Sequence, residues 1–337
     1  MTCPQLQAKL NILKSAQALL AQYDATDTTK AATAEMRTMT EEWEVVLDEL
    51  AEHFTVSIKQ AQAIMDKNIE QGKTHCLGPV ELEKAFGIKL DKKDIPKIPF
   101  SKEELERAAE KGQFLVLRAN VDDQGQPLTM KRLRAMMLRR GYDKELDKDG
   151  QAKGKITAGD DYSDVEKWWN DDPIELRWAL VDKEVIAGST KKDYHEQTKL
   201  LKKHITEKYQ GMTMPAKYIE AIKEFDAYVK TNFSSKTDAE INVLLRGNDW
   251  QKYAQDLSEL KLNDLMRKTP AEESFDEVFY YELNDERLNE RMYNWTKRRY
   301  SGGSLVDVGG FDSAGADPSG ASPDYRDGRL GVSSSCS

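Results

Sequence analysis

The last forty residues of the chain, Arg298 to Ser337, contain no Lys, Glu, Gln, Met or Trp, although Lys and Glu are common before them. Ser, Gly, Asp, Ala, Arg and Tyr fill the segment instead, a composition close to that of a flexible linker. Against a linker stand two groups of apolar residues: Leu305, Val306, Val308 and Phe311, then Leu330 and Val332. Trp295, just upstream, offers a large apolar body for them to pack on. The pattern therefore predicts short strands and loops with buried anchors.

The charge and composition of the whole chain limit its partners. Its 337 residues carry a net charge of −9, with 39% hydrophobic and 32% charged residues, which is typical of a soluble globular protein. An acidic chain lacks the clustered positive surface that phosphate binding needs, so we expect no nucleic acid partner. The basic residues of one helical stretch are interpreted as a solvated face: Lys131, Arg132, Arg134, Arg139 and Arg140. No apolar run is long enough to predict a membrane span.

Cysteine usage and the first residues indicate a compartment. Cys3, Cys76 and Cys336 are scattered without CxxC spacing, which is typical of a reducing environment and of a chain without a disulfide framework. The opening stretch MTCPQLQAKLNILKSAQALL lacks the unbroken apolar core of a signal peptide. We therefore expect a cytoplasmic protein.

The first part of the chain follows the helical period. Apolar residues recur at helical spacing through residues 1–72, and the last such run spans 58–69. This region is predicted to be a helical bundle or a coiled-coil arm, and it is the candidate contact for a homo-oligomer.

The rest of the chain, residues 73–337, mixes two textures. Apolar runs at 114–120 and 175–181 are suited to buried strands. Amphipathic helices are expected at 128–141 and, after a Ser/Thr cap, at 189–209. We therefore predict an α+β body that follows an N-terminal helical region.

Patterns that would support catalysis or metal binding are weak. The loop 145–150, ELDKDG, has the spacing of half a calcium loop, but Ile156 stands where the bidentate Glu is needed. The four histidines reach no metal-ligand spacing, and we expect His195 and His204 on exposed helix faces. The tryptophans at 168–169 are interpreted as core residues. No nucleotide-binding or nucleophile-elbow motif is present, so we expect no enzyme, no cofactor and no metal.

The residue types absent from the C-terminal segment have an explanation in the genetic code. Lys, Glu, Gln, Met and Trp are the amino acids that no codon ending in a pyrimidine encodes. Mutating the adenines of AAC or AAT codons therefore gives the alphabet seen here. Short motifs follow one another in order from residue 295 onward: Trp295-Thr296, Leu305-Val306, Val308-Gly309, Phe311-Asp312, Gly315-Ala316, Pro323, Leu330-Gly331-Val332 and Ser335.

These motifs resemble the variable region of target proteins of diversity-generating retroelements, of the type common in candidate-phyla bacteria. The stretches PFSKEELERAAEKGQFLVLRAN and YYELNDERL resemble the body of the same proteins, so the likeness covers the chain from about residue 79 onward. This chain departs from the family pattern at Pro318, Ser322, Ser334 and Cys336. Because apolar anchors are lost there, we expect the last strand to pack loosely.

The resemblance implies a C-type lectin-like domain that displays a hypervariable ligand-binding surface and needs no calcium. The variable, ligand-binding positions that it implies are Arg298, Arg299, Tyr300, Ser304, Asp307, Gly310, Ser313, Asp317, Ser319, Gly320, Asp324, Tyr325, Arg326, Asp327, Gly328 and Arg329. The framework positions that it implies are Trp295, Leu305, Val306, Val308, Phe311, Leu330 and Val332.

We therefore expect a non-enzymatic protein that binds a protein or another macromolecule noncovalently, with residues 296–337 as its variable region. Two alternatives stay open. One is an enzyme related to the formylglycine-generating proteins, which share the lectin-like fold but use metal-binding cysteines, whereas Cys336 stands alone here. The other is a helical oligomerising scaffold built on residues 1–72, with an incidental C-terminal tail.

Overall fold

The computed structural model describes residues 56–67, 69–143, 156–157, 165–312 and 315–337. The chain divides into two units, Met1–Val56 and Ser57–Ser337, and every helix and strand described here belongs to the second. The helices predicted before residue 56, and the loop 145–150, lie outside the described residues. The second unit combines helices with two mixed sheets, which confirms the predicted α+β class.

The first sheet has the strand order β1-β2-β3-β8. Its strands are β1 (Cys76–Leu77), β2 (Phe114–Arg118), β3 (Arg177–Val181) and β8 (Ser335–Cys336). β2 and β3 are antiparallel, with Val116 opposite Ala179. Every residue of β2 is buried, as expected of a strand covered on both faces. Both strands predicted from apolar runs are therefore confirmed.

Five short helices lie between residues 58 and 170: α3 (Ile58–Met65), α4 (Pro79–Phe86), α5 (Lys102–Glu110), α6 (Met130–Arg139) and α7 (Lys167–Asn170). α6 is the helix predicted at 128–141, and Thr129 caps its N-terminus. Of its basic side chains, Arg132 and Arg139 pair with Asp122 and Asp123. The tryptophans of α7 are buried, which confirms their interpretation as core residues.

The second sheet has the strand order β6-β5-β4-β7. Its strands are β4 (Tyr293–Arg299), β5 (Leu305–Asp312), β6 (Gly315–Ala321) and β7 (Leu330–Gly331). β4, β5 and β6 form an antiparallel meander, and β7 runs parallel to β4. At Gly309 an added Cβ would collide with the backbone oxygen of Met292, so only glycine lets the two strands approach there.

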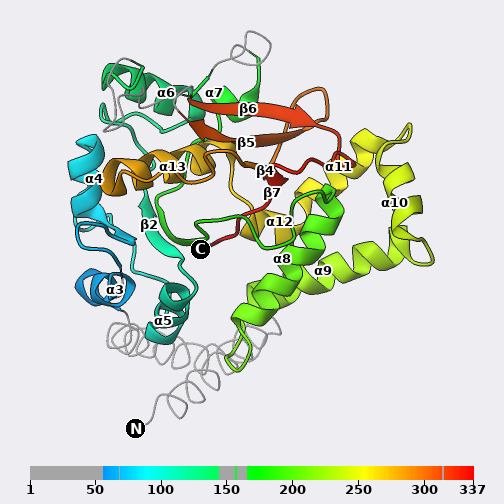
Figure 1. The fold of residues 1–337 in the computed structure, drawn as a ribbon, viewed down its shortest axis with the longest axis horizontal. Helices are drawn as coiled ribbons and strands as arrows, with labels where there is room; N and C mark the ends of the chain where they lie inside the picture. Colours follow the sequence, from blue (N-terminus) through cyan, green and yellow to red (C-terminus); the bar gives the residue numbers. More distant parts are fainter. Residues whose placement is uncertain (1–55, 68, 144–155, 158–164, 313–314) are drawn as a thin grey trace, which may run out of the picture. The chain divides into compact units, whose positions relative to one another are not determined.

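The helix α13 (Pro270–Asn284) lies between the two sheets (Figure 1). Pro270 is its first residue, and Thr269 and Glu272 form a capping box that fixes its start. Phe275 and Phe279 pack in the same core as Val306 and Val308 of β5 and Val116 of β2. This central helix therefore fixes where the second sheet sits on the body.

A second group of helices covers the other side of the unit (Figure 1): α8 (Tyr194–Lys208), α9 (Ala216–Phe233), α10 (Asp238–Leu245), α11 (Trp250–Glu259) and α12 (Lys261–Met266). Their core includes Trp295, Leu305 and Leu330 from the second sheet. Two cores thus hold the sheet: Val306 and Val308 pack with α13, and Trp295 and Leu305 pack with these helices. Among the described helices, none is long and apolar enough to cross a membrane.

Two expectations about α8 are wrong. Its N-cap is Asp193 rather than a Ser or Thr, because the Asp193 carboxylate accepts the amide of Glu196 and a capping box results. His195 is buried rather than exposed, since its ring packs on Phe225 and Phe233 of α9. Those aromatic partners come from a different helix, so the spacing of residues on α8 alone did not indicate them.

The loose packing expected for the last strand is also wrong. Ser334 and Cys336 are buried, and Cys336 pairs with Leu180 of β3. Polar contacts replace the missing apolar anchors. The Ser334 hydroxyl donates to the Asp182 carboxylate at 2.6 Å, and the Ser335 hydroxyl accepts from the Arg118 guanidinium at 2.8 Å.

Candidate functional site

The second sheet separates the two sets of positions read from the sequence. All seven framework residues are buried, with at most 3% of each side chain exposed. Among the proposed variable positions that the structure describes, Asp307 is buried and the others are half-buried or exposed. Ser313 lies outside the described residues. The two sets alternate along β5, where Asp307 stands between the core residues Val306 and Val308.

One face of the sheet collects variable side chains around Tyr293. In the strand register, Asp307 lies between Trp295 and Ser319, and Gly309 lies between Tyr293 and Asp317. Cross-strand neighbours share a face, so these side chains belong to the face opposite Val306 and Val308. Trp295 and Leu305 lie on the same face, and the core of the second helix group buries them. The Ser319 hydroxyl donates to the Asp307 carboxylate at 2.7 Å. This face is the first of three parts of the candidate site.

Asp307 is an acid held in an unusual place. Burial disfavours its charged form and raises its pKa to about 6, and the neighbouring charge of Asp317 acts in the same direction. The hydrogen bond from Ser319 opposes the shift but does not cancel it. Burial also raises the pKa of Tyr293, as do the charges of Asp317 and Asp307. A ligand that brings a positive group to this face would therefore favour ionised Asp307.

The second part is a strip at the end of β4 and the turn that follows. Arg298 makes a bidentate ion pair with Asp172, at 2.6 and 2.9 Å. The ring of Tyr300 packs edge-on against Trp168, with 5.3 Å between their centroids. Arg299 lies 3.8 Å from the Glu259 carboxylate. Each side chain of the strip is thus oriented by a residue outside the proposed variable set.

Beside this strip lies a hollow of about 370 Å³. Its lining includes Lys261 and Asp264 of α12 together with Lys297, Arg298 and Arg299 of β4. Lys297 pairs with Asp264 at 3.0 Å, so this lysine belongs to the constant wall. The cationic groups outnumber the anionic ones around the hollow, which suits an acidic group on a ligand.

The third part is the loop 322–329 between β6 and β7. Its Arg326 reaches across to the start of α8 and pairs with Asp193 at 2.6 Å and Glu196 at 2.8 Å. Backbone bonds fix the same contact, because the amide of Tyr194 donates to the carbonyl of Pro323 at 3.0 Å. Tyr325 is 47% exposed. The loop is therefore a fixed surface with an aromatic side chain presented to solvent.

Two of the proposed variable positions are restricted by the fold. At Gly320 an added Cβ would collide with the ring of Tyr300, so a larger residue there requires the ring to move. Gly310 has a φ of +61°, a left-handed conformation that Gly, Asn and Asp adopt most readily. A restriction of this kind arises from packing and backbone geometry, and composition alone did not indicate it.

Several residues that shape the site were not predicted from the sequence. Tyr293 stands at the centre of the sheet face, and Asp172 and Trp168 orient the strip. Asp193 and Glu196 hold the loop, and their capping-box spacing in DYHE was a readable signal for the start of α8. Their pairing with a residue more than a hundred positions away could not be read from that spacing.

Comparison with protein-family models, with curated proteins and with solved structures gave no match for this chain. Among the described residues, no three His, Cys, Asp or Glu side chains gather in a way that could hold a metal ion. The site is therefore argued from its own side chains: three parts, rich in Asp, Arg and Tyr, on a buried framework.

Proposed function

We propose that the chain is a non-enzymatic binding protein whose C-terminal segment is a hypervariable ligand-binding surface diversified by a retroelement. The framework would be C-type lectin-like, and the ligand a protein or another macromolecule. The observation that carries the proposal is that the seven framework residues are buried, whereas the described variable positions other than Asp307 are half-buried or exposed. Sequence change at the surface positions would alter the ligand without unfolding the sheet.

The chemistry of the surface supports noncovalent recognition. Tyr325 and Tyr300 offer rigid aromatic area, while Asp and Ser side chains offer adaptable hydrogen bonding, the mixture that antibody paratopes use. Ion pairs to constant residues, such as Arg298 with Asp172, hold the longer side chains in one geometry and lower the entropy lost on binding. The three parts extend over a sheet face, a strip and a loop, which favours a broad partner over a small molecule.

The diversification part of the proposal is tested by the DNA that flanks the gene. We expect a second, near-identical copy of the segment encoding residues 298–337, next to a reverse transcriptase gene. The copy should differ from the gene where it carries adenines, at codons of the proposed variable positions. Absence of both the copy and the reverse transcriptase would contradict retroelement diversification, and the surface would then have to be tested by binding alone.

The alternative of an incidental tail is tested by limited proteolysis of the full chain. An incidental tail is cut quickly, because exposed unpaired backbone fits a protease active site. We expect residues 298–337 to resist cleavage, since β5 and β6 pair with each other and β8 pairs with β3. Rapid loss of this segment, before cleavage elsewhere in residues 57–337, would support the scaffold alternative.

A further inference from the structure

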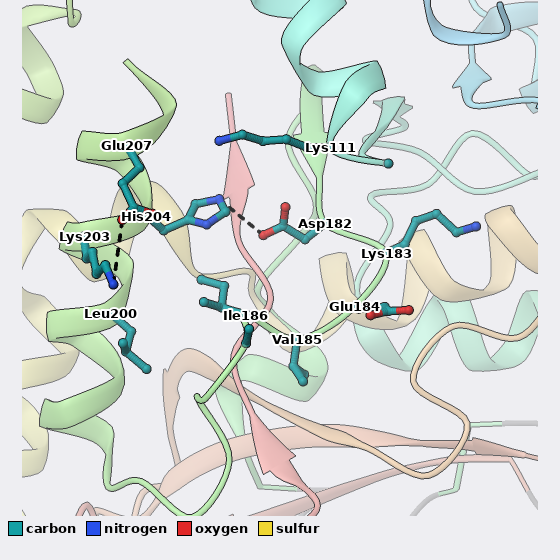
Figure 2. Close-up of a pocket in the computed structure, with 12 residues that line it drawn as sticks. Lys111, Asp182, Lys183, Glu184, Val185, Ile186, Leu200, Lys203, His204 and Glu207 are labelled. Atoms are coloured by element: carbon teal, nitrogen blue, oxygen red, sulfur yellow. Dashed lines mark ion pairs between the residues drawn. The ribbon is translucent and has the colours of Figure 1, made fainter. Parts of the chain in front are cut away.

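A pocket of about 600 Å³ lies away from the proposed variable surface (Figure 2). Three elements line it: the connection after β3, the outer face of α8, and the end of α5. Its lining includes Lys111, Asp182, Ile186, Leu200, Lys203 and His204. None of these residues is a proposed variable position, so the chemistry of this pocket stays constant when the surface changes. Its volume is in the range of small-ligand sites.

The acid nearest the centre of the pocket is already satisfied. The Asp182 carboxylate accepts from the side-chain amide of Gln113 at 2.6 Å, and from the Ser334 amide and hydroxyl at 2.9 and 2.6 Å. His204 Nε2 lies 3.2 Å from the Ser334 hydroxyl and 3.6 Å from Asp182. Because one imidazole nitrogen faces both partners, this is not the relay geometry of a nucleophilic serine. The cluster is a wall of the pocket.

The positive groups around the pocket differ in how far they are neutralised. Lys203 pairs with Glu207 at 3.7 Å, and Lys183 pairs with Glu286 at 3.0 Å. Among the described residues, Lys111 makes no ion pair. Figure 2 shows its ammonium group extending toward His204. Lys111 is therefore a cation at the pocket whose charge is not paired by any residue that the structure describes.

The pKa of His204 is set by burial and by nearby charges of both signs. Burial lowers the pKa of His204, and the charge of Lys111 lowers it further, against the opposing charge of Asp182. The Ser334 hydroxyl donates to Asp182, so the imidazole Nε2 carries the ring proton and donates to Ser334, which leaves no N–H of neutral His204 for a ligand. Glu184 is exposed and, in Figure 2, lies on the other side of the pocket from Lys111 and His204. The end of the pocket at Lys111 thus suits an anionic group.

The other end of the pocket is apolar. Figure 2 shows Leu200, Ile186 and Val185 below the polar end, on α8 and on the connection after β3. All three side chains are half-buried, so they keep apolar surface that a ligand can cover. The backbone of this wall is fixed, because the amide of Ile186 donates to the carbonyl of Val332 at 2.8 Å. The apolar end is therefore a rigid surface.

We propose that this pocket binds a small carboxylate that carries an apolar group, with the carboxylate at Lys111 and the apolar group on Leu200 and Ile186. This is a second, constant ligand site, and it does not depend on the function proposed for the variable surface. Two sources share the required chemistry: a short organic acid, and the C-terminal residue of a peptide. Both present one carboxylate next to a compact apolar group.

Isothermal titration calorimetry of the full chain tests the site with three probes. These are 4-methylpentanoate, N-acetylglycyl-leucine with a free carboxylate, and the amide of the same dipeptide. We expect saturable binding of at least one of the two acids, with the amide about 10-fold weaker or worse, because a charge-assisted hydrogen bond is lost. Tighter binding of the dipeptide indicates a peptide C-terminus, and tighter binding of 4-methylpentanoate indicates an organic acid. No saturation by about 10 mM, or equal binding of amide and acid, overturns the proposal.

Variants place the binding in this pocket. Lys111→Met should weaken acid binding about 10-fold, and Leu200→Asp should weaken it by as much or more, since it puts a charge at the apolar end. Lys102→Met is the matched control, because Lys102 is an exposed residue at the other end of α5. Thermal melting checks that each variant is folded. Unchanged affinity in folded Lys111→Met protein contradicts the site.

Discussion

The ion pairs around α13 differ in burial from those on the proposed variable surface. Around α13 they are fully buried: Arg118 pairs with Asp276 at 2.6 Å and with Glu272 at 3.1 Å, and all three side chains are inaccessible. On the variable surface, Arg326 pairs with Asp193 while 38% of the arginine side chain stays exposed. The first kind joins the two sheets through a central helix. The second kind joins a residue of the proposed variable set to a residue outside it.

The burial of a charged side chain decides whether it can be replaced at low cost in stability. Removing one partner of a buried pair leaves an uncompensated charge in a low-dielectric interior, whereas an exposed charge is solvated by water and screened by salt. Positions that can be replaced freely should therefore carry few buried charges. The buried ion pairs of Arg118 lie on β2 and α13, outside residues 298–329, and Asp307 is a buried acid within that range. We therefore expect the loss in the free energy of unfolding caused by a substitution to decrease from the buried centre to the surface.

The largest effect is expected for Arg118→Met. The substitution leaves Asp276 buried without its guanidinium partner and leaves Glu272 with Arg177 alone, so we expect a loss of about 3–5 kcal/mol in the free energy of unfolding. Urea denaturation measures it. Arg139→Met is the control, because Arg139 pairs with Asp123 at the surface and its loss should cost less than about 1 kcal/mol. Similar losses for the two variants would erase the distinction between the regions.

A comparable loss is expected at the apolar anchors of the second sheet. Trp295→Ala and Phe311→Ala each remove a fully buried aromatic ring, so each should lower the free energy of unfolding by about 3–5 kcal/mol. Thermal and urea unfolding give the values. A loss under about 1 kcal/mol at either position would mean that the framework does not hold the sheet.

Asp307→Asn should stabilise the protein at neutral pH. The folded pKa of Asp307, about 6, exceeds the unfolded value of 3.8, so the native state binds more protons between these pH values. The ionised group therefore opposes folding above pH 6, and its penalty disappears as the pH falls below the unfolded pKa. We expect the variant to be more stable than the parent by about 1–3 kcal/mol at pH 7, with no difference near pH 3. Equal stability at pH 7 would show that Asp307 is solvated.

Arg326 and Tyr325 should give the smallest effects on stability. Arg326→Ala removes a half-exposed pair with Asp193 and should cost about 1 kcal/mol or less, because the hydrogen bond from the Glu196 amide to Asp193 remains. Tyr325→Ala should change stability by less than about 0.5 kcal/mol, since the ring is exposed. Urea denaturation of the two variants measures this. A loss of unfolding free energy at Tyr325 as large as that at Trp295 would contradict the division between surface and framework positions.

Much of the fold could be predicted from local patterns. The strands β2 and β3 are continuous apolar runs, and the framework of β5 shows as apolar residues separated by polar ones. Patterns within a few residues carry this information. The burial of His195 depends on Phe225 and Phe233 of α9. The N-cap of α8 is Asp193, although a Ser and a Thr that could also cap a helix stand a few residues before it. These outcomes are set by tertiary packing, which local spacing does not encode.

The candidate site divides in the same way. The residues that anchor it were predictable, because apolar types in a Gly/Ser-rich segment have few other uses. The residues that orient it were not. Tyr293 became central through the strand register, and Asp172 and Asp193 became partners of Arg298 and Arg326 through contacts more than a hundred residues apart. The clash that a Cβ at position 320 would make with Tyr300 likewise depends on the turn after β4, which places the Tyr300 ring against β6.

The division between framework and variable surface is the central claim, and saturation mutagenesis of residues 293–332 with resistance to proteolysis as the readout tests it most directly. We expect most substitutions to be tolerated at the half-buried and exposed positions, with Gly310 and Gly320 as restricted exceptions. Most substitutions at the seven framework positions should abolish resistance. Equal tolerance, or equal intolerance, at the two sets of positions would contradict the claim.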